Sequence, residues 1–365
     1  MRIGTPKEIK NREARIGLTP SGACELVQAG HQVTIESDAG AAIGFSDQDY
    51  RMVGCAIAKD AEEVFDAADL IIKVKEPQPV EIARLKPRHT LFTYLHLAPD
   101  PDQARGLAAS GATCIAYETV TDRLGRLPLL TPMSEVAGRL SIQAGAQHLE
   151  IANGGSGVLL GGVTGVAPAN VVVIGGGVAG FNAAQMAIGL GANVTVLDRS
   201  IDRLRELNGL FDGRATCLFS TATAVEHAVR SADLVVGAVL LPGAAAPKIV
   251  TRKHIASMRA GSVVVDIAID QGGCFETSAP TSHDEPTFVI DGVVHYCVTN
   301  MPAAVARTST EALANATLPF ALQLANKGID AALEANPHLA AGLNVRGGKI
   351  VHPEVIASLE QAGQT

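Results

Sequence analysis

Three glycines form a pattern whose spacing has a chemical use. Gly175, Gly177 and Gly180 read G-x-G-x-x-G after the apolar stretch 171–174. The first glycine permits a tight turn, the second leaves room for a pyrophosphate, and the third lets the following helix, predicted over 179–190, pack closely on the strand. The free N–H groups at the start of such a helix attract phosphate. The pattern therefore predicts a bound dinucleotide; the alternative is that these glycines serve only as packing turns.

An acidic residue ends the next predicted strand. Asp198 follows the apolar stretch 194–197 and comes 23 residues after Gly175. A carboxylate at this place accepts hydrogen bonds from ribose hydroxyls and repels a 2′-phosphate, which favours NAD over NADP. Arg199 is the immediate neighbour of Asp198. Because a nearby arginine can accommodate the 2′-phosphate, this neighbour keeps NADP open as the alternative.

Three polar residues stand at the ends of other apolar stretches. Lys75 ends LIIKVK, His96 nearly ends TLFTYLHL, and Asp270 follows SVVVDIAI. Ligands of open α/β sheets bind beyond the carboxyl ends of the strands, so these side chains are candidates for a site. A lysine donates to a carbonyl, and a histidine or an aspartate can transfer a proton. The competing interpretations are that Lys73 and Lys75 face solvent on an edge strand, and that His96 is a satisfied buried histidine.

The elements that must position these residues alternate between strands and helices in two series. Helix-length segments between the strands favour parallel sheets. One connecting helix is predicted from Thr131, as its cap, and Pro132, as its first residue, to Glu150; a second covers 304–328, where Pro319 is expected to kink it. The strands are predicted at 2–4, 32–36, 70–75, 90–97 and 114–119, and then at 171–174, 194–197, 217–219, 234–239, 262–267 and 293–298.

We therefore predict an α/β protein of two Rossmann-like lobes. Each lobe is a mostly parallel sheet flanked by helices, and long connector helices join the lobes with a cleft between them. Residues 1–130 and 305–365 are expected to form a discontinuous substrate domain, and residues 131–304 an NAD-binding Rossmann domain. The length of 365 residues fits two domains, and the low aromatic content of 4% suits parallel strands built from Val, Ile and Leu.

The composition argues against several kinds of partner and location. The formal charge is −8 and no run of basic residues occurs, which disfavours nucleic acid and anionic membranes. The six cysteines contain no C-x-x-C pair, so we expect neither a zinc site nor a disulfide framework, and a reducing compartment, the cytoplasm, is favoured. The N-terminus has no apolar core of a signal peptide. Glycines interrupt the uncharged stretch 151–197 too often for a bilayer span.

Six longer stretches, in order along nearly the whole chain, resemble one enzyme family. Together they look like alanine dehydrogenase, in the NAD-dependent family that it shares with the NAD-binding subunit of transhydrogenase. The resemblance implies that L-alanine, NAD and water are converted reversibly into pyruvate, ammonium and NADH, by hydride transfer through iminopyruvate, in a homo-hexamer. The stretches are GTPKEIKNREARIGLTP (4–20), IKVKEPQP (72–79), LFTYLHLAPD (91–100), LLTPMSEVAGRLSIQAGAQHLE (129–150), DIAIDQGGCFETS (266–278) and VTNMPAAVARTST (298–310).

The resemblance also implies roles for particular residues. The family's substrate-carboxylate arginine falls on Arg15, its pyruvate-contacting lysine on Lys75, and its acid–base residues on His96 and Asp270. We expect Arg15 to hold the carboxylate with two parallel hydrogen bonds. Cofactor contacts are implied, besides the glycine turn and the acid that follows it, at Ser134, Val178, Ala179, Arg203, Ser220, Val239, Leu240, Ile267, Ala268, Asp270, Val298, Thr299, Asn300 and Met301.

Two positions depart from the pattern of some relatives. Ala279 stands where some relatives have an arginine near the cofactor. Some relatives hold magnesium with Glu118 and a histidine at the place of Lys327, and the lysine argues against a metal here. Other functions stay open: an NAD(H)-binding subunit of the transhydrogenase type, an opine- or saccharopine-type dehydrogenase, and a non-catalytic NAD-sensing protein, which would need no substrate residues.

Overall fold

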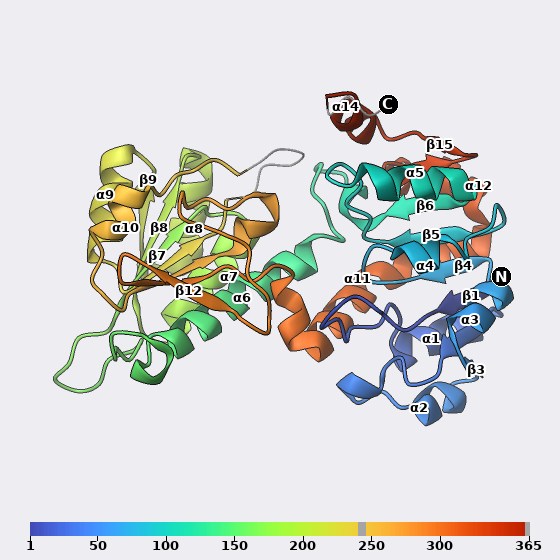
Figure 1. Ribbon diagram of the computed structural model, residues 1–365, viewed down its shortest axis with the longest axis horizontal. Coiled ribbons are helices and arrows are strands. Elements are labelled where there is room, and N and C mark those ends of the chain that lie inside the picture. The colour runs from blue at the N-terminus through green and yellow to red at the C-terminus, as the bar shows by residue number, and fades with distance from the viewer. Residues whose placement is uncertain (240–245, 362–365) are drawn as a thin grey trace. The chain divides into compact units, whose positions relative to one another are not determined.

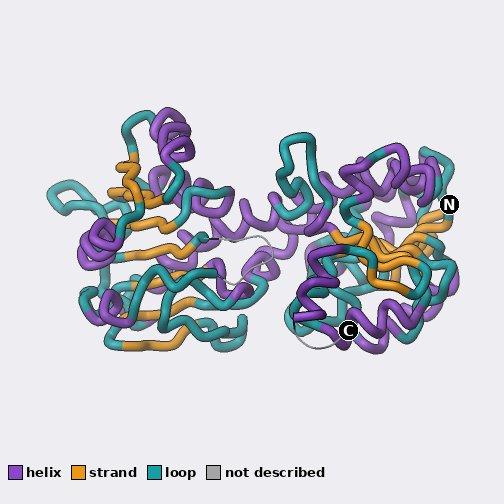
Figure 2. The backbone as a smooth tube through the Cα atoms, turned by 90° about the horizontal axis from the view of Figure 1, so that it is seen from above, coloured by secondary structure: helices purple, strands orange, loops and turns teal. Residues whose placement is uncertain are grey.

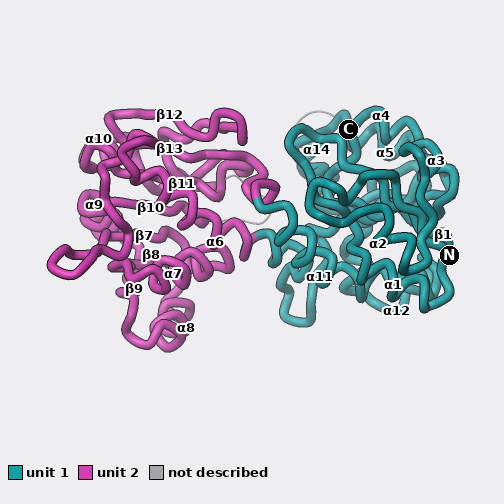
Figure 3. Tube along the Cα trace, turned by 90° about the horizontal axis from the view of Figure 1, so that it is seen from below, with its two compact units in different colours: residues 1–133, 305–365 teal, residues 134–304 magenta. Residues whose placement is uncertain are grey.

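Two compact units make up the chain. The computed structural model describes residues 1–239 and 246–361. Unit 1 comprises residues 1–133 and 305–365, and unit 2 comprises residues 134–304 (Figure 3). The chain passes from unit 1 to unit 2 along helix α6 (Thr131–His148). This helix begins at Thr131 itself, whose hydroxyl donates to the carbonyl oxygen of Leu127 (3.0 Å), so Thr131 is the first helical residue and not the cap that we predicted.

The sheet of unit 1 has a doubly wound strand order. Its strands are β1 (Arg2–Thr5), β2 (Gln32–Glu36), β3 (Ala56–Ala58), β4 (Leu70–Ile72), β5 (Thr90–Thr93), β6 (Thr113–Ala116), β14 (Leu343–Arg346) and β15 (Lys349–Ile350). Among the described residues the order is β15-β14-β6-β5-β4-β1-β2-β3. The strands from β6 to β3 are parallel, and β14 and β15 pair antiparallel at the edge. The order reverses between β1 and β4, whose carboxyl ends are therefore the expected ligand position.

Helices cover both faces of this sheet (Figures 1 and 2). The first helix begins as predicted, because Thr19 accepts a hydrogen bond from the amide of Gly22 (3.1 Å) and Pro20 is the first helical residue. The helices of unit 1 are α1 (Pro20–Gln28), α2 (Asp47–Met52), α3 (Ala61–Ala67), α4 (Pro79–Ile82), α5 (Pro101–Ser110), α11 (Ala306–Lys327), α12 (Ile329–Ala335), α13 (Pro337–Ala340) and α14 (Pro353–Gln361), with the 3₁₀ helices η1 (Ala41–Ile43) and η2 (Tyr117–Thr119).

Unit 2 repeats the doubly wound order. Its strands are β7 (Asn170–Ile174), β8 (Asn193–Asp198), β9 (Ala215–Phe219), β10 (Leu234–Gly237), β11 (Val263–Asp266), β12 (Thr287–Ile290) and β13 (Val293–Tyr296). In the described part of the unit they are ordered β12-β13-β11-β10-β7-β8-β9, and all are parallel except the edge strand β12. Here the order reverses between β7 and β10. Both units are thus the mostly parallel α/β layers that we predicted.

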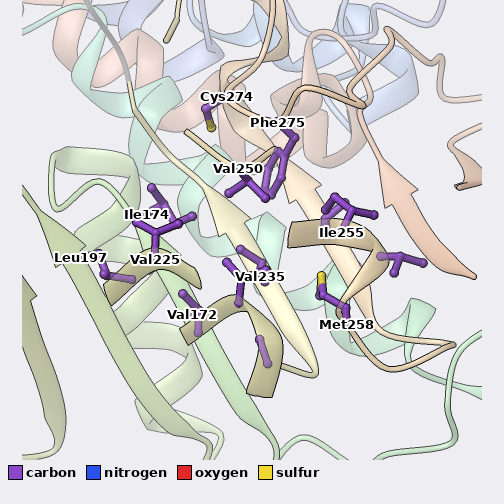
Figure 4. Packing of buried hydrophobic residues seen from close by; sticks show 14 of the residues in the cluster. Val172, Ile174, Leu197, Val225, Val235, Val250, Ile255, Met258, Cys274 and Phe275 are labelled. Atoms are coloured by element: carbon purple, nitrogen blue, oxygen red, sulfur yellow. The ribbon is translucent and has the colours of Figure 1, made fainter. Parts of the chain in front are cut away.

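One hydrophobic cluster of unit 2 lies between the sheet and the helices on one face. Val172 and Val235 project from neighbouring strands into this cluster, which also includes Val264 of β11 and residues of α9 and α10, and Phe275 packs against it (Figure 4). The helices are α7 (Val178–Gly189), α8 (Ile201–Phe211), α9 (Ala222–Ser231) and α10 (Arg252–Ala256), with η3 (Ile151–Asn153), η4 (Ile267–Gln271) and η5 (Met301–Val305). No described helix of either unit is long and apolar enough to cross a membrane.

Candidate active site

The glycine turn joins β7 to α7 and leaves the start of that helix open. Gly175 has a φ of +98°, and a Cβ on it would lie 2.8 Å from the carbonyl oxygen of Ala238. A Cβ on Gly180 would overlap the carbonyl oxygen of Gly175. Gly177, the N-cap of α7, faces open space within 4 Å of its Cβ position. Two of the glycines therefore serve close packing, and the third leaves the helix N-terminus accessible to a pyrophosphate.

Asp198 ends β8 and is joined to this turn. Its Oδ2 accepts a hydrogen bond from the amide of Gly176 (2.6 Å), and its Oδ1 accepts one from the amide of Ser200 (2.7 Å). Nε of Arg203 donates to the carbonyl oxygen of Gly176 (2.6 Å), and the amide of Ser220 donates to the carbonyl oxygen of Asp198 (2.9 Å). The structure thus joins Asp198 and Arg203 to Gly176, and Ser220 to the backbone of Asp198.

The remaining expected cofactor residues of unit 2 mostly follow strand ends. Because the main strands of this sheet are parallel, their carboxyl ends share one edge, which is where a dinucleotide binds in such sheets. Ser134 lies on α6, and Leu240 falls outside the described residues. The others are Val178 and Ala179 at the start of α7, Val239 after β10, Ile267 and Ala268 after β11, and Val298, Thr299, Asn300 and Met301 after β13.

Asp270 lies in η4, directly after β11, and its side chain is exposed. The turn that carries it is built around a different carboxylate, that of Asp266, which is fully buried. Burial raises the pKa of Asp266, although hydrogen bonds from Ser278 and from backbone amides oppose this shift. From the sequence we had treated Asp266 only as part of an apolar strand, so its role in holding the turn was missed.

Arg15 is buried in the loop after β1 and is paired within its own chain. Its Nε donates to Oε1 of Glu13 (2.7 Å) and its Nη2 to Oε2 of Glu13 (2.5 Å), while Nη1 contacts the sulfur of Met133 (3.1 Å). The two parallel bonds that we expected Arg15 to make with a substrate carboxylate are therefore made with Glu13 in this structure. Glu13 had no distinct role in the sequence interpretation, because it stood in a run of charged residues.

Lys75 follows β4 at the switch point of unit 1. Its Nζ lies 3.4 Å from Oε2 of Glu76, and Glu76 also pairs with Lys10. Burial acts to raise the pKa of Glu76, but the two lysines outweigh it and lower that pKa. Two cations thus share one carboxylate, which leaves one positive charge among these three side chains. Such a charge is suited to a carboxylate or a polarised carbonyl.

A buried ion cluster lies beneath Lys75. Nζ of Lys73 is 3.0 Å from Oε2 of Glu8 and 2.7 Å from Oε1 of Glu81, and the side chain of Lys73 is 0% exposed. The other oxygen of Glu8 accepts hydrogen bonds from the amides of Val74 (2.7 Å) and Lys75 (3.3 Å). Since β4 lies between β1 and β5, the interpretation of Lys73 and Lys75 as solvent-facing residues of an edge strand was wrong.

His96 follows β5 and is not a satisfied buried histidine. Its side chain is 43% exposed, its φ is +50°, and its ring stacks on that of Tyr94, with 5.7 Å between the ring centroids. Glu118 accepts hydrogen bonds from the amides of Leu95 (3.1 Å) and His96 (2.6 Å). A non-glycine residue in this left-handed conformation is strained and must be held by its surroundings. The bonds to Glu118 provide that hold, and they leave the imidazole facing outward.

Burial raises the pKa of Tyr94, and the nearby positive charge of Arg15 opposes this shift. Tyr94 is therefore close to Arg15 as well as to His96, and its hydroxyl donates to the carbonyl oxygen of Leu129 (2.5 Å). Arg15, Lys75 and His96 all follow parallel strands of one sheet, at the edge where its ligands are expected. Unit 1 thus presents cations and an exposed imidazole, and unit 2 presents an open phosphate turn.

Comparison with known proteins places the chain in a family. The model of the alanine dehydrogenase/PNT N-terminal domain matches residues 4–137, and that of the C-terminal domain matches residues 141–353. The chain belongs to the alanine dehydrogenase/PNT family. Within this family, the alanine dehydrogenase of Halomonas elongata is 61% identical over 97% of this chain and 96% of that protein. The alanine dehydrogenase of Mycolicibacterium smegmatis is 53% identical over 99% of this chain and 97% of its own length.

Solved structures agree with this family assignment. A structure named L-alanine dehydrogenase is 51% identical, covers 99% of both chains and superimposes with a TM-score of 0.96. A transhydrogenase from Sinorhizobium meliloti covers 97% of this chain and 99% of its own, with a TM-score of 0.82 and 24% identity. At that identity the transhydrogenase shows a shared fold alone.

Proposed function

We propose that this protein is an NAD-dependent L-alanine dehydrogenase. It would convert L-alanine, NAD and water reversibly into pyruvate, ammonium, NADH and a proton. The observation that carries the proposal is a combination of two features in one member of the alanine dehydrogenase/PNT family: an open dinucleotide turn backed by Asp198, and an edge of cations with an exposed imidazole. The alanine dehydrogenase of Halomonas elongata, 61% identical, supports the assignment of the substrate.

The residues of unit 2 fit NAD. Open space at Gly177 leaves room for the pyrophosphate at the start of α7, and Asp198 would accept from the ribose hydroxyls. When bound, NAD accepts the hydride from Cα of alanine. Arg15 and Lys75 would orient the carboxylate of the amino acid. Because Glu13 already balances part of the charge of Arg15, Lys75 would hold more of the substrate than the sequence alone predicted.

Loss of the hydride from Cα and of a proton from the amino group converts alanine into iminopyruvate, whose imine carbon is then open to water. His96 or Asp270 would accept a proton of that water as it attacks. A proton returned to the nitrogen, and loss of the remaining proton from the new hydroxyl, would then release ammonia, which leaves as ammonium, and form the carbonyl of pyruvate. Aligning the substrate Cα with the nicotinamide is the larger contribution to the rate. Proton transfer by a positioned side chain adds about 10²–10⁴-fold.

One set of assays separates this function from its alternatives. Oxidation of NADH is followed with pyruvate plus ammonium, with pyruvate plus lysine, and with a nucleotide analogue as the only other reactant. An alanine dehydrogenase oxidises NADH only in the first mixture. Oxidation in the second would identify an opine-type enzyme, and oxidation in the third a hydride exchange between nucleotides. No oxidation in any mixture would refute the proposal.

Two substitutions test the acid–base residues. His96→Ala and Asp270→Asn are expected to nearly abolish turnover while NADH still binds, because neither changes the glycine turn. His227→Ala and Asp202→Asn are matched controls, since both residues are exposed on helices of unit 2. Full activity in either of the first two variants would remove that residue from the mechanism.

We further propose a homo-oligomer, a hexamer by resemblance, in the cytoplasm. Ile151, Leu159, Val163 and Val166 are large aliphatic residues that are exposed on one uncharged segment, and such surfaces commonly lie at contacts between chains. All six cysteines are free thiols, in keeping with a reducing compartment. Light scattering coupled to size-exclusion chromatography measures the assembly, and a mass of one chain would exclude it.

A further inference from the structure

We propose that Asp266 is the positioning residue of Asp270: one buried carboxylate fastens both ends of the turn that presents the acid–base aspartate. This inference rests on the proposed function, because it assigns Asp270 to catalysis. Asp266 itself lies at the end of β11 and is 0% exposed, so it reaches neither solvent nor substrate. Its effect on the reaction would have to pass through the conformation of the turn.

The first end of the turn is fastened through Oδ1. The amide of Ala268 donates to this oxygen (3.1 Å), which caps η4 two residues before Asp270. The thiol of Cys274 lies 3.5 Å from the same oxygen. A carboxylate at the N-cap of a helical turn satisfies an amide that the turn itself leaves unpaired. The position of the cap therefore fixes the direction in which η4 leaves the sheet.

The second end of the turn is fastened through Oδ2. The amide of Cys274 (2.9 Å) and the hydroxyl of Ser278 (2.5 Å) donate to this oxygen, and the amide of Phe275 lies 3.4 Å away. Hydrogen bonds to an ionised acceptor are about twice as strong as those between neutral groups. The chain from 267 to 278 therefore leaves Asp266 and returns to it, with Asp270 between the two attachments.

The packing around the carboxylate leaves little room for another arrangement. A Cβ on Gly273 would overlap Oδ2 of Asp266, and a Cβ on Gly237 would lie 2.6 Å from the ring of Phe275. Phe275 and Cys274 are themselves part of the hydrophobic core of unit 2 (Figure 4). The returning end is thus anchored by packing as well as by hydrogen bonds, whereas Asp270 is exposed at the other side of the turn.

A double-mutant cycle separates positioning from a general effect on folding. Asp266→Asn replaces one of the two acceptor oxygens with an NH2 group. Whichever way the amide is turned, this NH2 group meets N–H or O–H donors and cannot accept from them. Misplacing a reacting group by about 1 Å costs on the order of 100-fold in rate, so kcat measured at saturating NADH is expected to fall by about that factor. Saturation is required because Ile267 and Ala268 of the same turn are expected cofactor contacts. In an Asp270→Asn background the same substitution should cause no further loss of kcat, because the group that Asp266 positions is already gone.

A second variant with a matched control tests the same inference in case Asp266→Asn does not fold. Ser278→Ala removes one donor from Oδ2 and should lower kcat in the same direction but less, and again only when Asp270 is present. Ser282→Ala is the matched control, because Ser282 is exposed and its hydroxyl accepts from the nearby amides of Asp284 and Glu285. Its kcat should equal that of the parent.

One outcome would overturn the positioning role of Asp266, and a different outcome would overturn the catalytic role of Asp270. If Asp266→Asn or Ser278→Ala lowers kcat equally with and without Asp270, the network is merely structural and the inference is overturned, while the proposed function stands. If Asp270→Asn alone keeps full turnover, the catalytic assignment fails and takes the inference with it. The residual activity of the Asp270→Asn background is measured with excess enzyme so that a further loss is detectable.

Discussion

Lys73→Met tests how much unit 1 depends on its buried ion cluster. Lys73 is a cation without exposed surface, 3.0 Å from Glu8 and 2.7 Å from Glu81. Methionine has a similar length and fills most of the same volume, so the substitution removes the charge and leaves the packing largely in place. Two carboxylates then remain buried without their cation.

The cost follows from the desolvation of those carboxylates. Removing one partner from a buried ion pair costs about 3–5 kcal/mol, because the other charge is left uncompensated. In domains of about 150–250 residues each kcal/mol shifts the unfolding temperature by about 2–4 °C, so the variant is expected to unfold about 6–20 °C below the parent. The exposed Lys59 pairs with Glu63 at 3.1 Å and provides a control, because Lys59→Met removes an ion pair that water already screens.

The dependence on pH identifies the cause. Burial already raises the pKa of Glu8 above its usual value of 4.5, and loss of Lys73 should raise it further. A carboxyl whose pKa is higher in the folded state loses stability as the pH rises through that pKa, so the deficit should be larger at about pH 8 than at about pH 5.5. Circular dichroism melts of both variants at the two pH values measure it. A melting point of Lys73→Met within about 2 °C of the parent at the higher pH would refute the reasoning.

Three further predictions concern the carboxyl ends of the strands in the two units. Asp198→Ala should weaken NADH binding and relax the preference for NADH over NADPH, and unchanged discrimination in fluorescence titrations would show that this acid is not the selector. Gly180→Ala should abolish NADH binding because its Cβ overlaps the glycine turn, whereas Gly189→Ala on the same helix meets open space and should bind NADH normally. Glu118→Gln should lower kcat with little change in the Kd for NADH, because the backbone of His96 loses a charged acceptor; an unchanged kcat would exclude that role.

Most of the strands were predictable from apolar runs, but several of their ends were not. The runs around β4 and β5 continue to Lys75 and Leu97, whereas the strands end at Ile72 and Thr93. Beyond those points the amides of Val74 and Leu95 donate to side-chain carboxylates that come from elsewhere in the chain. A pattern of apolar residues carries no information about such an acceptor. The strands β3, β12, β14 and β15, which lie at or next to the edges of the sheets, were not predicted.

The candidate site residues at strand ends were easier to predict from the sequence than the carboxylates that bind the backbone beside them. Lys75, His96 and Asp270 stand out because each is polar at the end of an apolar run. Glu8 and Glu118 do not stand out in this way. Glu8 belongs to a charged N-terminal segment, and Glu118 follows β6, although the predicted strand continued past it to residue 119. Their common function is to accept backbone amides at the point where a strand ends. A search for carboxylates near predicted strand ends would have included both residues.

The two units show how one topology can serve two purposes. In both, the strand order reverses between two central strands, β1 and β4 in one case and β7 and β10 in the other. In unit 2 the turn after β7 consists of glycines, and Gly177 leaves open space at the start of α7. In unit 1 the segment after β1 contains Glu8, whose carboxylate accepts hydrogen bonds from the amides of Val74 and Lys75. The side chain of Glu8 therefore occupies amides that a glycine turn would leave free for a phosphate, and the two switch points differ in the donors that they offer to a ligand.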